Sequence, residues 1–205
     1  MIMHNVKKLI KPVDFRPIPD SEVTGIVDKL SDVISKVGGT GLAANQIGID
    51  KGVCLINVET DPYYLVNPRI VDKSKNTHVY MEACVSLPKT LTKPVRTVRY
   101  EWVKVEADNL PEGHVFEADH PETWNENHEN FWKDIGFLEC VTVQHLIDIL
   151  NGVTIKDRVY STTRVNGKTY GRNDKVMVVD PKTGDSEFIK HKHSNRFLDK
   201  GWVIQ

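Results

Sequence analysis

The sequence has few cysteines, almost no net charge and no long apolar run. Its 205 residues include only three cysteines, Cys54, Cys84 and Cys140, and so sparse and odd a count favours reduced thiols over a disulfide scaffold. A net charge of −1 gives no global field that would attract nucleic acid or a membrane surface. No run reaches the about 20 apolar residues of a membrane helix, and the N-terminal stretch has no signal-peptide core. We therefore expect a cytoplasmic protein that does not enter a membrane.

What is present is an ordinary globular composition with uneven charge along the chain. Hydrophobic residues make up 40% and charged residues 27%, as in typical soluble domains. Residues 106–134 hold nine acidic residues against one basic residue, and residues 165–205 hold eight basic against five acidic residues. The first stretch is typical of a surface insertion and the second of an appended tail. We predict a main domain at 1–160 with an acidic insertion at about 106–134, followed at 161–205 by a linker and a small basic extension.

Hydrophobic spacing predicts an α+β fold. Apolar residues recur every three or four positions over residues 21–37, which predicts an amphipathic helix with Ser21 as N-cap and Gly38 as its stop. A second, more apolar helix is predicted to end near Gly152. Strands are predicted at 52–59, 63–72, 78–88 and 93–107. Beyond them, the sequence indicates a linker or extended hairpin at 161–174, two short strands around a turn at 181–184, and a short helix ending at Gly201.

His145 is the residue in the second helix that invites a chemical interpretation. It shares one helical face with Val141, Ile149 and Gly152, at spacings of four, eight and eleven residues from Val141. A single histidine on such an apolar face is more often a hydrogen-bonded core residue than a metal ligand. Its own helix therefore does not decide its role, and the rest of the chain has to.

Three short stretches stand in order along the chain: GTGLAANQIG (39–48), EACVS (82–86) and QHLIDILNG (144–152). They resemble the three signature motifs of the peptide deformylases, GxGLAAxQ(I/V)G, EGC(L/V)S and QHExDHLxG, and the resemblance extends over residues 5–158. That family removes the N-formyl group from newly made proteins by metal-dependent hydrolysis. The resemblance implies the family's α+β fold, with mixed or antiparallel sheets around a central helix that carries the third motif. A small C-terminal extension follows that fold here.

The resemblance also implies roles for individual residues. Cys84 and His145 match two ligands of the family's catalytic metal, Zn²⁺ or Fe²⁺. Gln46 and the backbone N–H of Val85 match the groups that position and stabilise the reacting oxygen. A further set matches the stretch along which a peptide would pair with a strand edge: Gly39, Gly41 and Leu42. For the glycines and for Gln46, inherited scaffold is the alternative to retained peptide binding.

The third motif departs from the family pattern at the two positions that carry the chemistry. Leu146 stands where the family has its glutamate general base, and Ile149 stands where it has its second ligand histidine. Ala83 replaces the glycine of the second motif, which is a mild change. An aliphatic side chain has no lone pair, so it can neither accept a proton nor bind a metal. We therefore expect no cofactor, with Zn²⁺ or Fe²⁺ retained only if another donor substitutes.

Other side chains of the sequence carry donors that could in principle substitute for the missing ones. Asp148 lies three residues after His145 and could form an HxxD pair, although the matching family residue supports the site without binding metal. Cys140 lies about 140° round the helix from His145 and should face elsewhere. The histidines of the acidic stretch are expected to be solvated loop residues: His114, His120 and His128.

These observations favour a degenerate deformylase that retains at most binding of a peptide N-terminus, a ribosome-associated nascent chain or another partner. One alternative is an active deformylase with a rearranged metal site. Another is a non-enzymatic interaction protein that uses the acidic insertion or the basic tail. The tail resembles weakly a segment of phage-encoded proteins, which hints at a phage origin. Four of its residues could contact nucleic-acid phosphates, although solvated charges are the favoured interpretation: Arg172, Lys190, Lys192 and Arg196.

Overall fold

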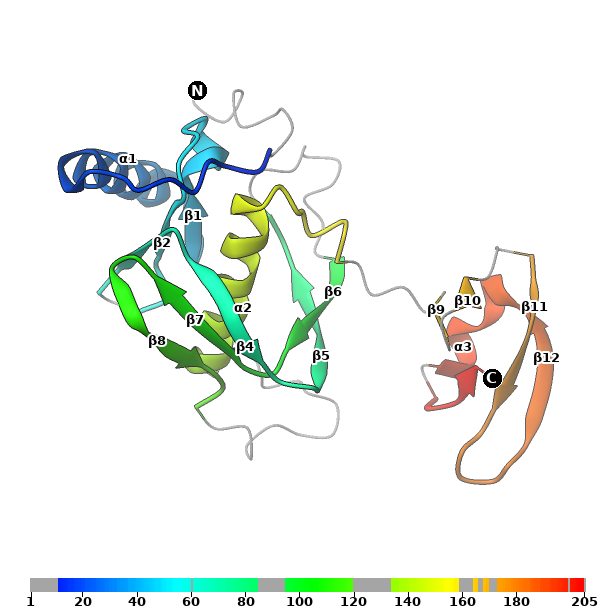
Figure 1. Ribbon diagram of the computed structural model, residues 1–205. Coiled ribbons are helices and arrows are strands. Elements are labelled where there is room, and N and C mark those ends of the chain that lie inside the picture. Colours follow the sequence, from blue (N-terminus) through cyan, green and yellow to red (C-terminus); the bar gives the residue numbers. More distant parts are fainter. Residues whose placement is uncertain are drawn as a thin grey trace. The chain divides into compact units, whose positions relative to one another are not determined.

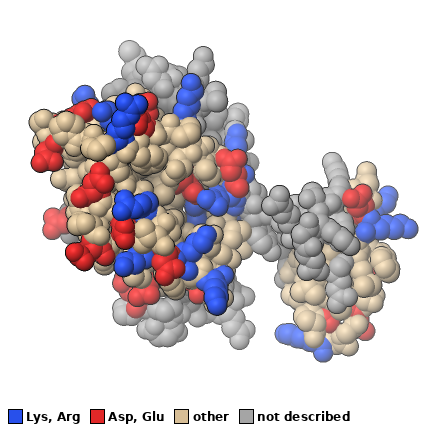
Figure 2. Space-filling view, in the orientation of Figure 1, with Lys and Arg blue, Asp and Glu red and all other residues tan. Residues whose placement is uncertain are grey.

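The computed structural model describes residues 11–59, 61–84, 95–119, 134–158, 164–165, 168–169, 173–198 and 200–204. The chain divides into two compact units, Met1–Val159 and Tyr160–Gln205 (Figure 1). Acidic and basic side chains are interspersed over the visible face of the first unit (Figure 2). Among the described residues, no helix is long and apolar enough to cross a membrane.

The first unit surrounds one central helix with small antiparallel sheets (Figure 1). Its sheets have the strand orders β1-β2-β3, β4-β7-β8 and β5-β6, and every strand pair described in them is antiparallel. The predicted α+β fold is thereby confirmed. In chain order, its described helices and strands are α1 (Asp20–Val37), β1 (Gly41–Ala43), the 3₁₀ helix η2 (Ala44–Ile47), β2 (Val53–Ile56), β3 (Tyr63–Val66), β4 (Arg69–Lys73), β5 (Thr77–Glu82), β6 (Val95–Tyr100), β7 (Val103–Ala107), β8 (Leu110–Phe116) and α2 (Ile135–Leu150).

Helix α2 is the core of this unit. Twelve of its sixteen residues are buried, as expected of a helix that is apolar all round. Its side chains share one cluster with inward residues of the β4-β7-β8 sheet, among them Val103, Val105 and Phe116. Helix α1 instead buries a single stripe, which includes Leu30 and packs on β1 and β2 in a second cluster. The third motif therefore lies on a helix that is buried along most of its length.

Two predicted strands are each broken into two. The stretch 63–72 divides into β3 and β4 at Asn67 and Pro68, where Asn67 has a positive φ of 50°. Proline lacks a backbone N–H, and a left-handed residue cannot continue a strand, so the chain turns there. The stretch 93–107 divides into β6 and β7, and the side-chain oxygen of Ser74 accepts the N–H groups of Glu101 and Trp102 at the break. These breaks let the chain pass from one sheet to the next.

The acidic stretch predicted as an insertion begins within regular structure. Residues 106–116 complete β7 and form β8, and Phe116 is buried in the main core. His114, predicted as a loop histidine, lies on β8 with its ring 4.7 Å from that of Phe116. Residues 120–133, with His120 and His128, lie outside the described residues. Residues 106–107 and 110–116 of the predicted insertion are therefore strand and not a surface loop.

The two long helices begin in different ways. Helix α1 ends at Gly38 as predicted, but its N-cap is Pro19, with no side-chain cap, so the prediction of Ser21 is wrong by two positions. Asp20 and Glu22 in its first turn favour the earlier start, because carboxylates stabilise the positive end of a helix. Helix α2 is capped by Asp134, whose carboxylate oxygen Oδ1 accepts the N–H of Phe137 at 2.9 Å. The same oxygen also accepts the N–H of Asp119 at 2.9 Å.

Replacing Asp134 by alanine should lower the free energy of unfolding by about 1–2 kcal/mol, the usual cost of losing an N-cap. The substitution removes the acceptor of two backbone N–H groups, one of them buried. Ser21→Ala is the matched control, because Ser21 is exposed and makes no cap, and it should cost less than about 0.5 kcal/mol. Urea unfolding followed by circular dichroism measures both values. Equal effects of the two substitutions would contradict the assignment.

The second unit is a small sheet closed by short helical turns. Strand β11 (Lys175–Val179) pairs with β12 (Ser186–Lys190) and with β13 (Val203–Ile204), and α3 (Asn195–Leu198) lies between the last two in sequence. Its core consists of Val176, Val178, Ile189 and Ile204. The short pair β9 (Arg164–Val165) and β10 (Lys168–Thr169) forms the extended hairpin expected before it.

Candidate active site

A cavity of about 380 Å³ brings the three motifs together in the first unit. It is lined from the first motif by Gly39–Gly41 and Gln46, from the second by Glu82–Cys84, and from the third by His145 and Leu146. Apolar side chains of α2, among them Leu138 and Val141, complete its wall. Three segments that are far apart in the sequence therefore meet at one face of α2.

His145 is the ionisable residue that α2 presents to this cavity, where Thr142 of the same helix also lines the wall. Its side chain is 15% exposed, and its Nδ1 lies 3.0 Å from Oε2 of Glu82. Burial would lower the pKa of His145, but hydrogen bonds with Cys84 and Glu82, and the charges of these two residues, raise that pKa to about 9. The imidazole is thus held from two sides, which fixes its orientation.

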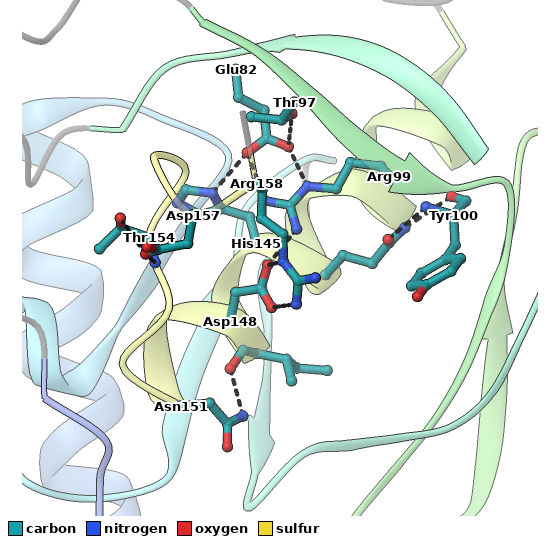
Figure 3. A network of polar contacts seen from close by, with 12 residues as sticks. Glu82, Thr97, Arg99, Tyr100, His145, Asp148, Asn151, Thr154, Asp157 and Arg158 are labelled. Carbon is teal, nitrogen blue, oxygen red and sulfur yellow. Dashed lines mark hydrogen bonds and ion pairs between the residues drawn. The ribbon is translucent and has the colours of Figure 1, made fainter. Parts of the chain in front are cut away.

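Glu82 is a buried carboxylate at the end of β5, with 4% of its side chain exposed. Arg99 on β6 approaches it through Nε and through Nη2, the latter at 2.8 Å, and the Thr97 hydroxyl donates to Oε1 at 2.9 Å (Figure 3). Burial would raise the pKa of Glu82, but its contacts with Arg99 and His145 outweigh burial and lower the pKa to about 2. Glu82 is therefore an anion held in a fixed position beside Nδ1 of His145.

Asp148 joins the same network and does not line the cavity. Nη1 of Arg99 donates to its Oδ2 at 2.5 Å, and Arg158 reaches both of its oxygens, at 2.9 and 2.6 Å (Figure 3). A carboxylate that binds two guanidinium groups is committed to structural support. The HxxD pair that the sequence left open is therefore not formed around the cavity.

Leu146 and Ile149 fill with carbon the two positions where the family pattern has donors. Leu146 is 1% exposed and lies so close to β1 that a Cβ added to Gly41 would be 2.7 Å from its Cδ1. Ile149 is fully buried and belongs to the same core cluster as Cys84 and Leu146. Glycine at position 41 is needed for this close approach of strand and helix. Both side chains are therefore structural members of the core.

Gln46 is oriented by its own backbone turn. The N–H of Ala43 donates to Oε1 of Gln46 at 2.8 Å, so the amide nitrogen Nε2 points the other way, towards Cys84 Sγ at 4.0 Å. Gly39, with φ of 114°, and Gly41 line the cavity. Leu42 does not: it is 2% exposed and packs with α1, because side chains alternate along a strand. Val85 lies outside the described residues.

Of the remaining residues, Cys140 does not line the cavity, whereas Glu82 and Arg99 have contacts that the sequence did not predict. Cys140 is fully buried, and its sulfur lies 3.9 Å and 3.7 Å from the carbonyl oxygens of Tyr100 and Glu101. Sequence reasoning assigned no role to Glu82 or Arg99, although Glu82 is the first residue of the second motif. The place of Glu82 in that motif is the feature from which its role could have been predicted. No comparable feature marks Arg99, because an arginine on a strand of alternating apolar residues is usually exposed.

The donors at the cavity do not fit a catalytic metal site. Such a site needs three protein ligands and an open position, whereas here Cys84 and His145 stand beside aliphatic Leu146 and Ile149. The carboxylate of Glu82 accepts hydrogen bonds from Arg99 and His145, so it is not available as a further ligand. Within the described part of the chain, no group of three or more His, Cys, Asp or Glu side chains is arranged to hold a metal ion.

Comparison with known proteins identifies relatives of this chain by sequence. The sequence profile described as "Polypeptide deformylase" matches residues 3–165. A peptide deformylase of Heliobacterium modesticaldum is 30% identical over 164 residues, which are 78% of this chain and 95% of the relative. One from Natranaerobius thermophilus is 32% identical over 147 residues, covering 71% of this chain and 81% of the relative.

Solved structures that are similar to this chain are also those of peptide deformylases. The crystal structure of peptide deformylase from Thermotoga maritima is similar with a TM-score of 0.54 at 26% identity, covering 76% of this chain and 91% of that one. The deformylase of the Vibrio parahaemolyticus bacteriophage VP16T, solved with actinonin, gives a TM-score of 0.53 at 26% identity, covering 72% and 93%. A phage origin for this chain stays a prediction.

Proposed function

This chain belongs to the polypeptide deformylase family, and we propose that it keeps the family's peptide-binding cavity without metal-dependent hydrolysis. The observation that carries this proposal is the burial of Leu146 and Ile149 in the core at the two positions of the motif that should bear donors. Two ligands do not make a catalytic metal site. Loss of a general base alone typically costs about 10²–10⁴-fold in rate. The two losses act on the same step, so their costs are not multiplied.

The features that would receive a peptide support the binding part of the proposal. The cavity has the size of a small-ligand site and mostly apolar walls. Gln46 presents an oriented amide to it, and Gly39 and Gly41 leave backbone accessible at its rim. An apolar N-terminal side chain such as methionine matches these walls. The partner proposed is therefore a peptide with an N-terminal methionine, formylated or not.

Calorimetric titration of the full chain with Met-Ala-Ser and with formyl-Met-Ala-Ser tests this directly. Gln46→Leu should weaken binding of the formylated peptide by about 3- to 10-fold, the worth of one hydrogen bond. Asn76→Leu is the matched control, because Asn76 is exposed and does not line the cavity, and it should bind as the wild type does. Binding of neither peptide at millimolar concentration would contradict the proposal. A partner whose binding is lost when residues 165–205 are deleted would instead favour an interaction protein that binds through its basic tail.

A further inference from the structure

Cys84, His145 and Glu82 form a hydrogen-bonded series at the cavity. Glu82 holds Nδ1 of His145 at 3.0 Å, and His145 also hydrogen bonds Cys84. A nucleophile within reach of a base, with the base oriented by a third group, is the arrangement that activates cysteine in acyl transfer. Here the aliphatic neighbours that remove the metal site leave this series in place.

The two ends of the series are fixed by the rest of the fold. Arg99 and Thr97 hold Glu82 from the side away from His145 (Figure 3), so the carboxylate stays directed at Nδ1 of His145. At the other end, Nε2 of Gln46 lies 4.0 Å from Cys84 Sγ. An amide donor at that place can hydrogen bond the oxygen of a carbon attached to the sulfur, as in an oxyanion-stabilising site.

Neither of the other two cysteines lines the cavity beside a histidine, although the amide nitrogen Nε2 of Gln144 donates to the Cys140 sulfur at 3.2 Å. Cys54 and Cys140 are fully buried and do not line the cavity. Burial raises the pKa of Cys54 to about 12 and that of Cys140 to about 11, so both thiols are poor nucleophiles. Cys84, although 4% exposed, lines the cavity beside a histidine. The chain therefore contains its own internal controls for thiol reactivity.

Resting on the proposed loss of the metal, we propose that Cys84 is a nucleophile that accepts a small acyl group from an ester or thioester, with His145 as the base and Glu82 and Gln46 as positioning groups. The acyl chain would enter the apolar part of the cavity, formed by Leu138, Val141 and Leu146 among others.

The reaction is balanced without metal or oxidant. The Cys84 sulfur attacks the carbonyl carbon and a C–S bond forms, while His145 holds the proton that the thiol has given up. The bond from carbon to the leaving alcohol or thiol breaks, and the leaving group takes that proton. Water then attacks the acyl-cysteine with proton transfer to His145, the C–S bond breaks, and the proton returns to sulfur. The net change is ester plus water to acid plus alcohol.

Esters and thioesters fit this site better than formamides do. An alcohol or thiol leaves more readily than an amine, which must be fully protonated and needs a strongly stabilised oxyanion first. Among the described side chains, Gln46 is the amide donor directed at Cys84. The activity is therefore distinct from removal of an N-formyl group.

The test uses the full chain with EDTA, p-nitrophenyl acetate as the acyl donor, and intact-mass and peptide mapping. We expect a single acetyl group on the peptide that contains Cys84, and none on those with Cys54 or Cys140. His145→Gln should slow acylation by at least about 10²-fold, and Cys84→Ala should abolish it. Cys140→Ala should leave the rate unchanged. The thermal melting curve of each variant shows whether it is folded.

Acetyl groups spread over all three cysteines, or a folded His145→Gln variant that acylates at the wild-type rate, would overturn the inference. The metal content of the purified protein separates this failure from failure of the proposed function. Metal-free protein whose Cys84 is not acylated overturns only the thiol chemistry. Protein that carries about one equivalent of Zn²⁺ or Fe²⁺, and whose Cys84 reacts only after metal removal, overturns the loss of the metal and this inference with it.

Discussion

Supplied with excess Zn²⁺, Fe²⁺ or Ni²⁺, the purified protein should release formate from formyl-Met-Ala-Ser at least about 10³-fold more slowly than its Thermotoga maritima relative. Leu146 offers no proton acceptor at the position of the general base, and Ile149 offers no third ligand. Formate release coupled to formate dehydrogenase measures the rate. A rate within tenfold of the relative would mean that a donor outside the described residues completes the site.

The reciprocal experiment restores the missing donors. Leu146→Glu combined with Ile149→His should raise the metal content from less than about 0.1 to near one equivalent, because Cys84, His145 and the new histidine supply the three ligands that a catalytic zinc requires. The matched control is Ile147→His, which adds a histidine to α2 beside a different pocket and should take up no metal. Elemental analysis after dialysis gives the result. A folded double variant that stays metal-free would show that the positions of Cys84 and His145 have drifted from a ligand geometry.

The elements of the fold follow from local patterns to a large extent. Hydrophobic spacing predicts α1 and α2 because each periodic run is long, and Gly38 ends α1 as a glycine stop should. What local pattern could not give is where a run of β-type residues breaks. The break at Glu101 depends on the Ser74 hydroxyl, which lies 27 residues away in sequence. The apolar alternation changes phase there, from Val98, Tyr100 and Trp102 to Val103, Val105 and Ala107. A shift of one residue is also the pattern of a β-bulge within a continuous strand, so it does not by itself predict a break.

The site was predictable where a motif carries it and unpredictable where long-range packing carries it. The three motifs place Gln46, Cys84 and His145 around one cavity without any structural input. The carboxylate beneath His145 is supplied by Glu82, 63 residues earlier in the chain, and its partner Arg99 is set by the register of β5 against β6. The side chain of Leu42 packs with α1 and not at the cavity, which a motif match could not show because it says nothing of which face of a strand a residue occupies.

The register of β5 against β6 leads to the largest expected effect on stability. Arg99→Met should lower the free energy of unfolding by about 3–5 kcal/mol, the usual cost of breaking a buried ion pair by removing one partner. Arg99 is 3% exposed and holds both Glu82 and Asp148. Methionine nearly preserves the volume of arginine, so the loss reports the two carboxylates and not a cavity. Arg158 still reaches Asp148 in the variant, which leaves Glu82 as the main uncompensated charge.

The matched control is Arg69→Met, which removes the exposed partner of the Arg69–Glu106 pair. It should cost less than about 1 kcal/mol, since water screens an ion pair at the surface. Adding Glu82→Gln to Arg99→Met should recover part of the loss, because a neutral amide is cheaper to bury than an unpaired carboxylate. Urea unfolding of the wild type and of the three variants measures the free energy of unfolding of each protein. If Arg99→Met costs no more than Arg69→Met, Glu82 is not the fixed anion beneath His145, and the orientation of His145 must come from Cys84 alone.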